Sequence, residues 1–540
     1  MSRTVSLCAL SLTALIATSA VAAVITVPGD YPLIHDAVQA AQPGDVVEVA
    51  AGTYTDCTHE TEGPGTTPAC VIMKSGVTLR GAGTGATIID AQGLGRGIFV
   101  EYVEDCRIEN LQVRNAFAAA YGAGILLRHV GLDVVVSDVL VTLCTDGGVI
   151  CYDEGSPTLI RVDCVGNEAK QGGGLAIEED SSPWVIECLI DANEAPSGAG
   201  IFVRNGSDAY ISRCTVTNNV INADWGQGGG LFIADSAPTI TLCDISGNSA
   251  LGNGGGVAYQ LGAGGTLAGC TITDNTLDNS WCYGGGVAID SSDPLIEGCV
   301  IVGNRCVDPW SDGAGVHALY DPVATLRNCT IADNVGSTSG GLGSGVYSYD
   351  SAIVVDKCII AYNTLGAGIF CEDGDAPTVS CCDIYGNEGG DTPCGTDGGG
   401  NFTLEPLFCG AGDYLLQAGS PCATGCDGAL IGAKPADCGA TGADDAPRSP
   451  AQLIGNYPNP FNPSTTIVFR LDEPGAADVR IFDVAGRTLT TFTWSDLPAG
   501  RHEAVWNGRT ADGQQAASGV YFYELDALNT QQSRRMILIK

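Results

Sequence analysis

Short runs of alternating apolar and polar residues recur along most of the chain, and helical periodicity is rare. Thr239–Ile245 (TITLCDI) and Val287–Ile289 alternate with a period of two, which is typical of a strand with one buried face. The runs recur every 24–30 residues, a spacing typical of stacked supersecondary units. Ankyrin, tetratricopeptide and HEAT arrays need helices, and leucine-rich repeats need a Leu scaffold that is absent here. The pattern therefore predicts a parallel β-helix whose coils contribute two or three short strands each.

Two residue types mark each repeat at a fixed position, because Asn follows Cys by five residues in eight successive repeats. The asparagines are Asn193, Asn219, Asn248, Asn275, Asn304, Asn334, Asn363 and Asn387. The cysteines are Cys188, Cys214, Cys243, Cys270, Cys299, Cys329, Cys358 and Cys382. Side chains at equal positions of coils stacked about 4.8 Å apart form ladders. We expect each Asn to occupy a left-handed turn position and its amide to hydrogen-bond from coil to coil.

The Cys column belongs to the same alternation as the apolar residues, so we expect an inward-facing ladder of buried thiols. The coil spacing would also permit disulfides between neighbouring cysteines of the column. Gly-Gly-Gly or Gly-x-Gly precedes an alternating run in the same phase, as at Gly172, Gly228 and Gly284, and should supply positive φ at another corner. The sequence thus predicts an all-β protein, with about 10–12 coils of parallel β-helix across residues 76–393.

The two ends of the solenoid need caps. Residues 24–75 should form the N-terminal cap, because Ile34, Ala37, Val38 and Ala41 follow the spacing of an amphipathic helix. The Cys-rich segment 394–436 lacks the clean repeat, and we expect it to close the other end.

The segment VITVPGDYPLIHDAVQAAQPGDVVEVAAGTYTD (residues 24–56) resembles the opening of pectate-lyase-like right-handed β-helix proteins. The Gly and Cys/Asn repeats resemble the exported bacterial branch of that group. The resemblance covers about residues 24–440 and implies a right-handed coil. It does not imply one activity, because lyases, hydrolases, epimerases, adhesins and tailspikes share this fold.

Residues 437–452 are rich in Gly, Ala, Asp and Pro and are predicted to be a linker. Short strands and turns then predict a small antiparallel, Ig-like β-sandwich at residues 453–540. NYPNPFNPSTTIVFRL (456–471), VRIFDVAGR (479–487) and ASGVYFYEL (517–525) resemble the type IX secretion sorting domain and, equally, the immunoglobulin-like domain of flagellar hook-capping proteins. That resemblance implies delivery by a secretion machinery, followed by release or surface attachment.

Residues 1–23 have the charged start, apolar centre and small-residue end of a signal peptide, and no later run is long enough for a transmembrane helix. The net charge of −38 lies almost wholly in residues 24–450, because residues 451–540 hold 8 Lys/Arg and 9 Asp/Glu. A body this acidic repels nucleic acid and anionic membranes. We therefore expect a secreted or outer-membrane-surface protein that does not bind nucleic acid.

Several cysteines outside the column are candidates for disulfides in an oxidising exterior. Cys57 and Cys70 flank a Pro/Gly/Thr loop, and Cys282 and Cys306 lie in equivalent loops of neighbouring coils. A third group crowds the C-terminal segment: Cys394, Cys409, Cys422, Cys426 and Cys438. Zinc is the alternative for this group, although it lacks His and paired Cys-x-x-Cys spacing.

Charged residues gather where the strands that follow the glycines end. Counting along successive coils brings together Arg128, His129, Asp153, Glu154, Glu178, Glu179, Asp180 and Arg204. Later coils add Asp235, Asp290, Asp321, Asp350 and Asp373 near the same edge. Carboxylates on neighbouring coils suit a glycosidase, and a lyase would need a base beside Arg. Asp153, Glu179 and Asp180 would suit Ca²⁺, whereas Asp and Ser at strand ends also simply begin turns.

Motifs for catalysis are missing, because Asn-Thr-Asp, Gly-His-Gly, Arg-Ile-Lys, Trp-Ile-Asp-His and Asp-Pro-His-Glu do not occur. The leading hypothesis is therefore a non-enzymatic surface protein that binds an extracellular polysaccharide or cell-surface component, or has a structural role. One alternative is a polysaccharide lyase or glycoside hydrolase acting at the Arg128–Arg204 face. The other is an envelope scaffold that depends on Ca²⁺, with no other cofactor.

Overall fold

The fold was obtained as a computed structural model. It describes residues 22–538, apart from residues 439–450 and these short stretches: 62–66, 119–121, 123, 280–282, 307–310, 321–322, 338–341, 373, 375, 411, 427, 437, 458–460, 462, 472–473, 484–486, 498–499 and 529. The predicted signal peptide and most of the predicted linker lie outside the described residues.

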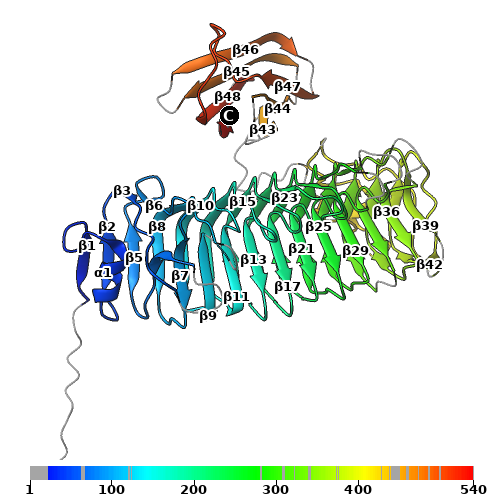
Figure 1. The fold of residues 1–540 in the computed structure, drawn as a ribbon. Helices are drawn as coiled ribbons and strands as arrows, with labels where there is room; N and C mark the ends of the chain where they lie inside the picture. Colours follow the sequence, from blue (N-terminus) through cyan, green and yellow to red (C-terminus); the bar gives the residue numbers. More distant parts are fainter. Residues whose placement is uncertain are drawn as a thin grey trace, which may run out of the picture.

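The body is a parallel β-solenoid in which successive coils stack in register (Figure 1). In a typical coil, β13 (Leu175–Glu178) joins a 12-stranded sheet, here called sheet B. The next two strands, β14 (Trp184–Ile186) and β15 (Leu189–Asp191), join the 25-stranded sheet A, and β16 (Glu194–Ala195) joins the small sheet C. The predicted all-β fold of about 10–12 coils is confirmed.

The other strands of sheet B are β4 (Ala69–Ile72), β7 (Arg96–Glu101), β9 (Ile125–Val130), β11 (Val149–Gly155), β17 (Ile201–Arg204), β21 (Leu231–Ala234), β25 (Val257–Gln260), β29 (Val287–Asp290), β33 (Val316–Leu319), β36 (Gly343–Tyr349) and β39 (Ala367–Glu372). Sheet C also contains β20 (Val220–Ile221), β24 (Ser249–Ala250), β28 (Thr276–Leu277) and β32 (Arg305–Cys306). Sheet A also contains β1 (Val24–Val27), β2 (Val46–Val49), β3 (Gly52–Tyr54), β5 (Thr78–Gly81), β6 (Thr87–Asp90), β8 (Arg107–Arg114), β10 (Val135–Thr142), β12 (Thr158–Val165), β18 (Tyr210–Ser212), β19 (Thr215–Thr217), β22 (Thr239–Thr241), β23 (Asp244–Ser246), β26 (Thr266–Ala268), β27 (Thr271–Thr273), β30 (Leu295–Glu297), β31 (Val300–Val302), β34 (Thr325–Arg327), β35 (Thr330–Ala332), β37 (Val354–Asp356), β38 (Ile359–Ala361), β40 (Thr378–Ser380), β41 (Asp383–Tyr385) and β42 (Thr396–Gly399).

A continuous asparagine ladder runs inside the corner between sheets A and C. Each side-chain amide donates to the carboxamide oxygen of the next coil, as from Asn193 Nδ2 to Asn219 Oδ1 at 2.9 Å, and to a backbone carbonyl of the coil before. The ladder begins one repeat earlier than the predicted column, at Asn167, and passes from Asn387 to Asp391. Every one of these buried amides therefore has its hydrogen bonds met by its neighbours.

The sequence prediction placed the left-handed backbone on the ladder asparagines themselves, and that was wrong by one residue. The positive φ belongs to the residue before each Asn, as at Ala192 (φ 54°) and Asp274 (φ 54°). Because the turn is completed one residue earlier, the Asn side chain points inward, where its amide reaches both neighbouring coils.

The glycine runs are required by this same ladder. A Cβ built on Gly200 would lie 2.9 Å from Asn219 Nδ2 and 2.4 Å from the Gly230 carbonyl oxygen, and Gly256 has the equivalent contacts. The third position of each run therefore has no room for a side chain. The first position, as at Gly228 (φ 67°), has the positive φ that the turn into sheet B needs.

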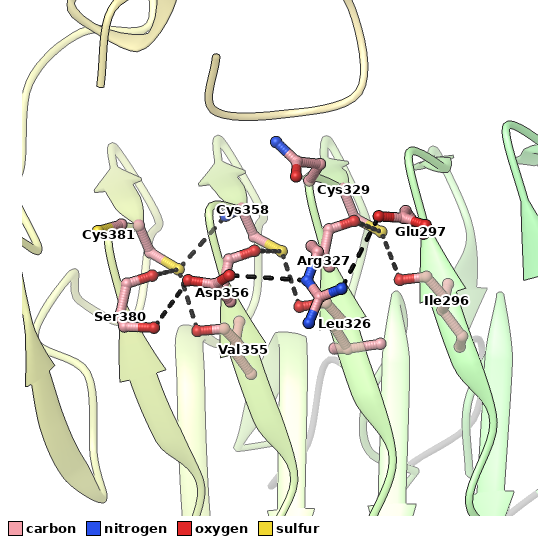
Figure 2. A network of polar contacts seen from close by, with 12 residues as sticks. Ile296, Glu297, Leu326, Arg327, Cys329, Val355, Asp356, Cys358, Ser380 and Cys381 are labelled. Atoms are coloured by element: carbon pink, nitrogen blue, oxygen red, sulfur yellow. Dashed lines mark hydrogen bonds and ion pairs between the residues drawn. The ribbon is translucent and has the colours of Figure 1, made fainter. Parts of the chain in front are cut away.

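The eight column cysteines lie inside the solenoid, and each is at most 3% exposed. None of the eight is disulfide-bonded in the part of the chain that the structure describes. Their thiols contact backbone carbonyls instead: Figure 2 shows Cys329 Sγ 3.4 Å from the Ile296 oxygen and Cys358 Sγ 3.5 Å from the Leu326 oxygen. Burial raises the pKa of Cys299, which keeps this thiol protonated and unreactive.

The N-terminal end is covered by helix α1 (Ile34–Ala40), which buries Ile34, Ala37 and Val38 against the first coils. A disulfide joins Cys57 to Cys70 beside it. Cys282 lies outside the described residues, so its pairing with Cys306 stays a prediction.

The C-terminal segment covers the last coil of the solenoid only with its first part, because β42 pairs with β40 and Phe402 pairs with Asp383. After β42 the chain turns back along the outer face of sheet A, where Tyr414 donates to Asp333 at 2.7 Å and Asn328 donates to the Leu430 carbonyl at 2.8 Å. The physical reason lies in the coils beneath, whose outward positions carry apolar residues such as Val300, Ala332 and Ile359 that this segment buries.

Disulfides fasten this segment to the last coils. Cys371 pairs with Cys394, Cys381 with Cys426, and Cys409 with Cys438. Cys422 instead donates its thiol to Asp383 Oδ2 at 3.0 Å. Four of the five cysteines of the predicted group are thus in disulfides, in place of the zinc alternative. Cys409 and Cys438 pair with each other, whereas Cys394 and Cys426 pair with Cys371 and Cys381, which were not foreseen.

The tail is a separate antiparallel sandwich with its own core. One sheet contains β43 (Ala451–Tyr457), β44 (Thr465–Leu471) and β47 (Gly500–Trp506). The other contains β46 (Thr488–Leu497), β45 (Gly475–Asp483), β48 (Gly519–Ala527) and β49 (Thr530–Leu538). Phe469, Ile481, Trp506 and Tyr523 are buried between the sheets.

We predict that Asn219→Ala destabilises the solenoid by about 3 kcal/mol, because the change removes its bond to the Ile190 carbonyl and one bond of Asn193 Nδ2, and leaves the buried Asn193 backbone N–H without its partner. Thermal melting and native-state hydrogen exchange would measure the loss, and exchange should be fastest in the flanking coils. Thr215→Ala, on the outer face of the same coil, is the control and should change stability by less than about 0.5 kcal/mol. Equal effects of the two substitutions would contradict the ladder's role.

Candidate functional site

Charged and aromatic side chains form a stripe where the strands of sheet B end. The register pairs Glu101 with Arg128, Arg128 with Tyr152, and Tyr152 with Glu178 on successive coils. The residue that follows each of these in the chain, namely Tyr102, His129, Asp153 or Glu179, has positive φ, which turns its side chain onto the same edge. We call this set the sheet B stripe: Glu101, Tyr102, Arg128, His129, Tyr152, Asp153, Glu178, Glu179, Arg204 and Asn205.

Arg128 forms the centre of the first part of the stripe. Its guanidinium contacts Glu101 Oε1 at 2.8 Å on the coil before, and Asp153 Oδ2 at 2.5 and 3.1 Å on the coil after. His129 Nε2 lies 3.2 Å from the same Asp153 oxygen. The Tyr102 ring stacks on His129 with 4.4 Å between centroids and is 71% exposed. The Arg128 guanidinium is thus paired with carboxylates of both neighbouring coils, and the exposed Tyr102 ring lies beside it.

Arg204 and two carboxylates form the second part. Burial raises the pKa of Glu178, and the nearby Arg204 guanidinium opposes that rise. Arg204 Nε donates to Asn205 Oδ1 at 2.9 Å, and Asn205 Nδ2 donates to Glu179 Oε1 at 2.6 Å. These contacts form a chain of guanidinium, amide and carboxylate groups across two coils.

The structure does not assemble the predicted calcium site. Asp153 is engaged by Arg128 and His129, and Glu179 is engaged by Asn205. Asp180 contributes its backbone N–H to the turn, donating to the Asn205 carbonyl. Among the described residues no group of three or more His, Cys, Asp or Glu side chains is arranged to hold a metal ion. The carboxylate oxygens that Ca²⁺ would need are thus engaged by Arg128 and His129 at Asp153 and by the Asn205 amide at Glu179.

The remaining acidic positions lie in turns built on buried serines. Ser236, which follows Asp235, accepts a hydrogen bond from the Ser207 N–H, and Ser181 accepts one from the Gly155 N–H. Ser351, which follows Asp350, bonds the Ser348 hydroxyl. Asp290 accepts from the adjacent Ser291. The acidic residues at these strand ends therefore belong to turns. Asp321 and Asp373 lie outside the described residues.

The face around the stripe is flat. Only two residues separate β11 from β12, and five separate β13 from β14, so the turns that follow the stripe are short. Glu154 lies in one of these turns, where its N–H donates to the Glu179 carbonyl. The stripe thus presents a row of groups one coil apart, with no long loop rising beside it.

Sequence reasoning missed a second aromatic column on sheet B. Rings stack outside the strands in the order Tyr283, His317, Tyr347 and Phe370, at centroid distances of 4.5, 4.8 and 5.7 Å. His317 is 2% exposed, and neither of its ring nitrogens has a hydrogen-bond partner. The register superposes His317, Tyr347 and Phe370, whereas Tyr283 reaches the stack from the turn before β29, and the varying coil length hides this column in the sequence. Since both nitrogens are covered, His317 packs as an aromatic ring.

Parallel coils stacked in register with inward ladders define a parallel β-helix protein. A family model described as a right-handed β-helix region matches residues 75–242, 196–339 and 229–405, which together are more than half of the chain. The chain therefore belongs to the right-handed β-helix family. A model of the FlgD Ig-like domain matches residues 459–531 in the tail, which supports an Ig-like sandwich there.

Solved structures similar to the chain include the A-module of the mannuronan C-5 epimerase AlgE6 from Azotobacter vinelandii. It is 15% identical over 69% of this chain and 94% of its own, with a TM-score of 0.33. ORF18 of Geobacillus virus E2 is 11% identical over 90% and 75%, with a TM-score of 0.28. Latent PorU from Porphyromonas gingivalis is 23% identical over 16% of this chain and 9% of its own, with a TM-score of 0.15. No curated protein matches the chain.

Within the described residues, no helix has the length and apolar character needed to cross a membrane. Four disulfides are present there, a number compatible with an extracellular protein.

We predict that His317→Phe raises the free energy of unfolding by about 2 kcal/mol at pH 7, because it removes two buried nitrogens that lack partners and keeps the ring stack. Burial lowers the pKa of His317 to about 3. In the unfolded chain His titrates near about 6.5. As the pH falls from about 6.5 toward 3, the unfolded chain therefore binds a proton that the buried His317 does not, and the wild-type protein loses stability.

Urea unfolding at pH 7 and pH 4 would measure both effects, and the gain from His317→Phe should be larger at pH 4. The exposed Tyr320→Phe is the control in the same coil and should be neutral at both pH values. A loss of stability in His317→Phe would mean that its nitrogens are bonded after all.

Proposed function

We propose that the protein is exported to the cell exterior and binds a polysaccharide along the sheet B stripe. The observation that carries this proposal is a flat row of already paired polar groups, spaced one coil apart, beside the exposed Tyr102 ring. Such a row has the repeat of a linear polymer, and an aromatic face is a good platform for a sugar ring. Carboxylate and amide groups fixed by their neighbours can accept and donate to sugar hydroxyls without first being ordered.

The ion pairs of Arg128 favour a binding role of the stripe over a catalytic role. A lyase needs a free base with a cation ready to neutralise developing charge, whereas Arg128 already bridges two carboxylates. The short turns around Asp153 and Glu179 also leave the face open to water, which weakens electrostatic catalysis.

The negative charge of the solenoid favours neutral glycans over anionic ones. Residues 24–450 carry nearly the whole net charge of −38, so polyuronates and sulfated glycans are repelled. A neutral polysaccharide fits this surface best.

One observation favours the alternative of glycoside hydrolysis. Burial raises the pKa of Glu178, and the neighbouring coil carries the Asp153 carboxylate. A carboxyl group with a raised pKa and a second carboxylate nearby are the two groups that glycosidases use. In this mechanism Glu178 would protonate the leaving oxygen.

For the tail we propose a sorting role. Its FlgD-like sandwich is a compact unit with its own core, and the segments it shares with sorting domains lie in its strands. The tail would engage a secretion machinery, and the solenoid would be its cargo.

We predict that the mature chain, residues 24–540, is retained by at least one neutral polysaccharide in affinity electrophoresis, and that Tyr102→Ala weakens this retention about tenfold, or about 1.4 kcal/mol. The matched control is Tyr320→Ala, an exposed tyrosine at the equivalent turn position four or more coils away, which should bind normally. Stronger retention by polyuronates than by neutral glycans would contradict the proposal.

The same incubations would be assayed for new reducing ends. Binding without cleavage supports the proposed role. Cleavage that Glu178→Gln abolishes, at unchanged retention, would establish the hydrolase in its place.

We predict that deletion of residues 453–540 leaves a folded solenoid inside the cell envelope, measured by fractionation of the native host and by the melting of the recovered protein. Deletion of residues 439–445 within the linker is the control and should still reach the exterior. Normal export of the tail-less chain would refute the sorting role.

A further inference from the structure

A cavity of about 220 Å³ opens beside the N-terminal cap, away from the sheet B stripe. Its walls come from the start of α1, from the end of β3 and the residues after it, and from β4 and β6. Leu33, Ile34, Val71 and Ile89 give it an apolar floor, whereas His35, Tyr54, Thr55 and Asp56 give it polar edges. A largely apolar hollow with a few convergent polar groups is the usual form of a small-ligand site.

The hairpin beside the cavity is held by several independent contacts. The Cys57–Cys70 disulfide closes its base, and His59 and Ala69 exchange two backbone hydrogen bonds. Arg96, only 2% exposed, donates to the Thr61 hydroxyl and the Thr67 carbonyl from below, each at 3.2 Å. These contacts hold His59 against His35 at the edge of the cavity.

The two imidazoles stack with 3.7 Å between centroids and 14° between planes. The Ile72 N–H donates to His35 Nδ1, so the proton of the neutral His35 ring lies on Nε2. His59 Nε2 lies 3.1 Å from Asp56 Oδ2. Burial and the neighbouring His59 lower the pKa of His35, and Asp36 and Asp56 act in the opposite direction. His35 is therefore neutral at pH 7 and offers the cavity an N–H donor.

These groups match a sugar ring. An apolar cavity of about 150 Å³ holds one six-membered carbon ring, so the present cavity has room for one ring with its hydroxyls. The His35 donor, the Asp56 acceptor and the hydroxyls of Thr53 and Thr55 suit a ligand rich in hydroxyl groups. Asp56 in the wall and Asp36 beside it oppose a carboxylated sugar.

We propose that this cavity binds the terminal sugar of a neutral glycan chain. The proposal rests on the glycan-binding function proposed above and adds a second site to it. Protonation of His35 at Nδ1 would break the Ile72–His35 hydrogen bond, so binding should weaken at acid pH.

The test uses the mature chain and saturation-transfer NMR with methyl glucoside, methyl galactoside and methyl mannoside, with methyl glucuronoside as the charged comparison. At least one neutral glycoside should bind, and the glucuronoside should bind at least tenfold more weakly. Asp56→Asn should weaken binding about tenfold, and Thr55→Trp should abolish it by filling the mouth of the cavity. Ala51→Trp, at an exposed position of the same coil outside the cavity wall, is the matched control and should bind normally. Melting curves would verify that each variant is folded.

His59→Phe keeps a ring stacked on His35, so it should bind the same glycosides at pH 7. Absence of binding by every neutral glycoside, or binding that Thr55→Trp leaves unchanged, would overturn the proposal. Because Tyr102→Ala and polymer retention test the stripe separately, polysaccharide retention without a Thr55→Trp effect would refute the cavity alone. Glycoside binding that Thr55→Trp abolishes supports the cavity even if no polymer is retained.

Discussion

The structure depends on one constraint, the in-register stacking of coils by backbone hydrogen bonds. Equivalent residues of adjacent coils lie directly over one another. The residue type at each position must therefore be able to pack against the same type about 4.8 Å away. Asn meets this demand because its amide both donates and accepts, as between Asn248 and Asn275. Gly286 meets it because a Cβ there would lie 2.9 Å from Asn304 Nδ2. A small buried thiol meets it without needing a specific partner.

The same constraint determines how charges are arranged outside. Like charges stacked in one column would repel, so arginines lie between carboxylates of the two flanking coils. Arg80 contacts Glu48 and Glu109, and Arg161 contacts Asp138 and Glu187. Arg327 repeats the pattern with Glu297 and Asp356 (Figure 2). Most of these pairs are partly exposed and stabilise little individually. Their main effect is on the register of the coils. A shift of the register by one coil would place like charges over one another and is therefore disfavoured.

Features generated by the repeat could be predicted from the sequence, whereas contacts that occur once could not. The columns of Asn193 and Cys188 follow from period and alternation alone, and the stripe from Arg128 to Arg204 follows from counting along the strands. The pairing of Arg128 with Glu101, and the stack on His317, depend on where side chains of unequal coils meet. The backward turn of the C-terminal segment depends on apolar outward residues such as Val300, which look like ordinary strand residues in the sequence.

The charge pattern also links the fold to the ligand. Each arginine placed between two carboxylates leaves a group with a net charge of −1, so a solenoid stabilised against slippage in this way becomes more acidic with every such triplet. The arginines of these triplets are engaged in coil-to-coil pairing and are not available to bind an anionic polymer. The proposed recognition would then use hydroxyl acceptors, amides and exposed rings, which the stripe and the N-terminal cavity contain. The preference for neutral glycans that we propose would therefore follow from how the coils are held in register.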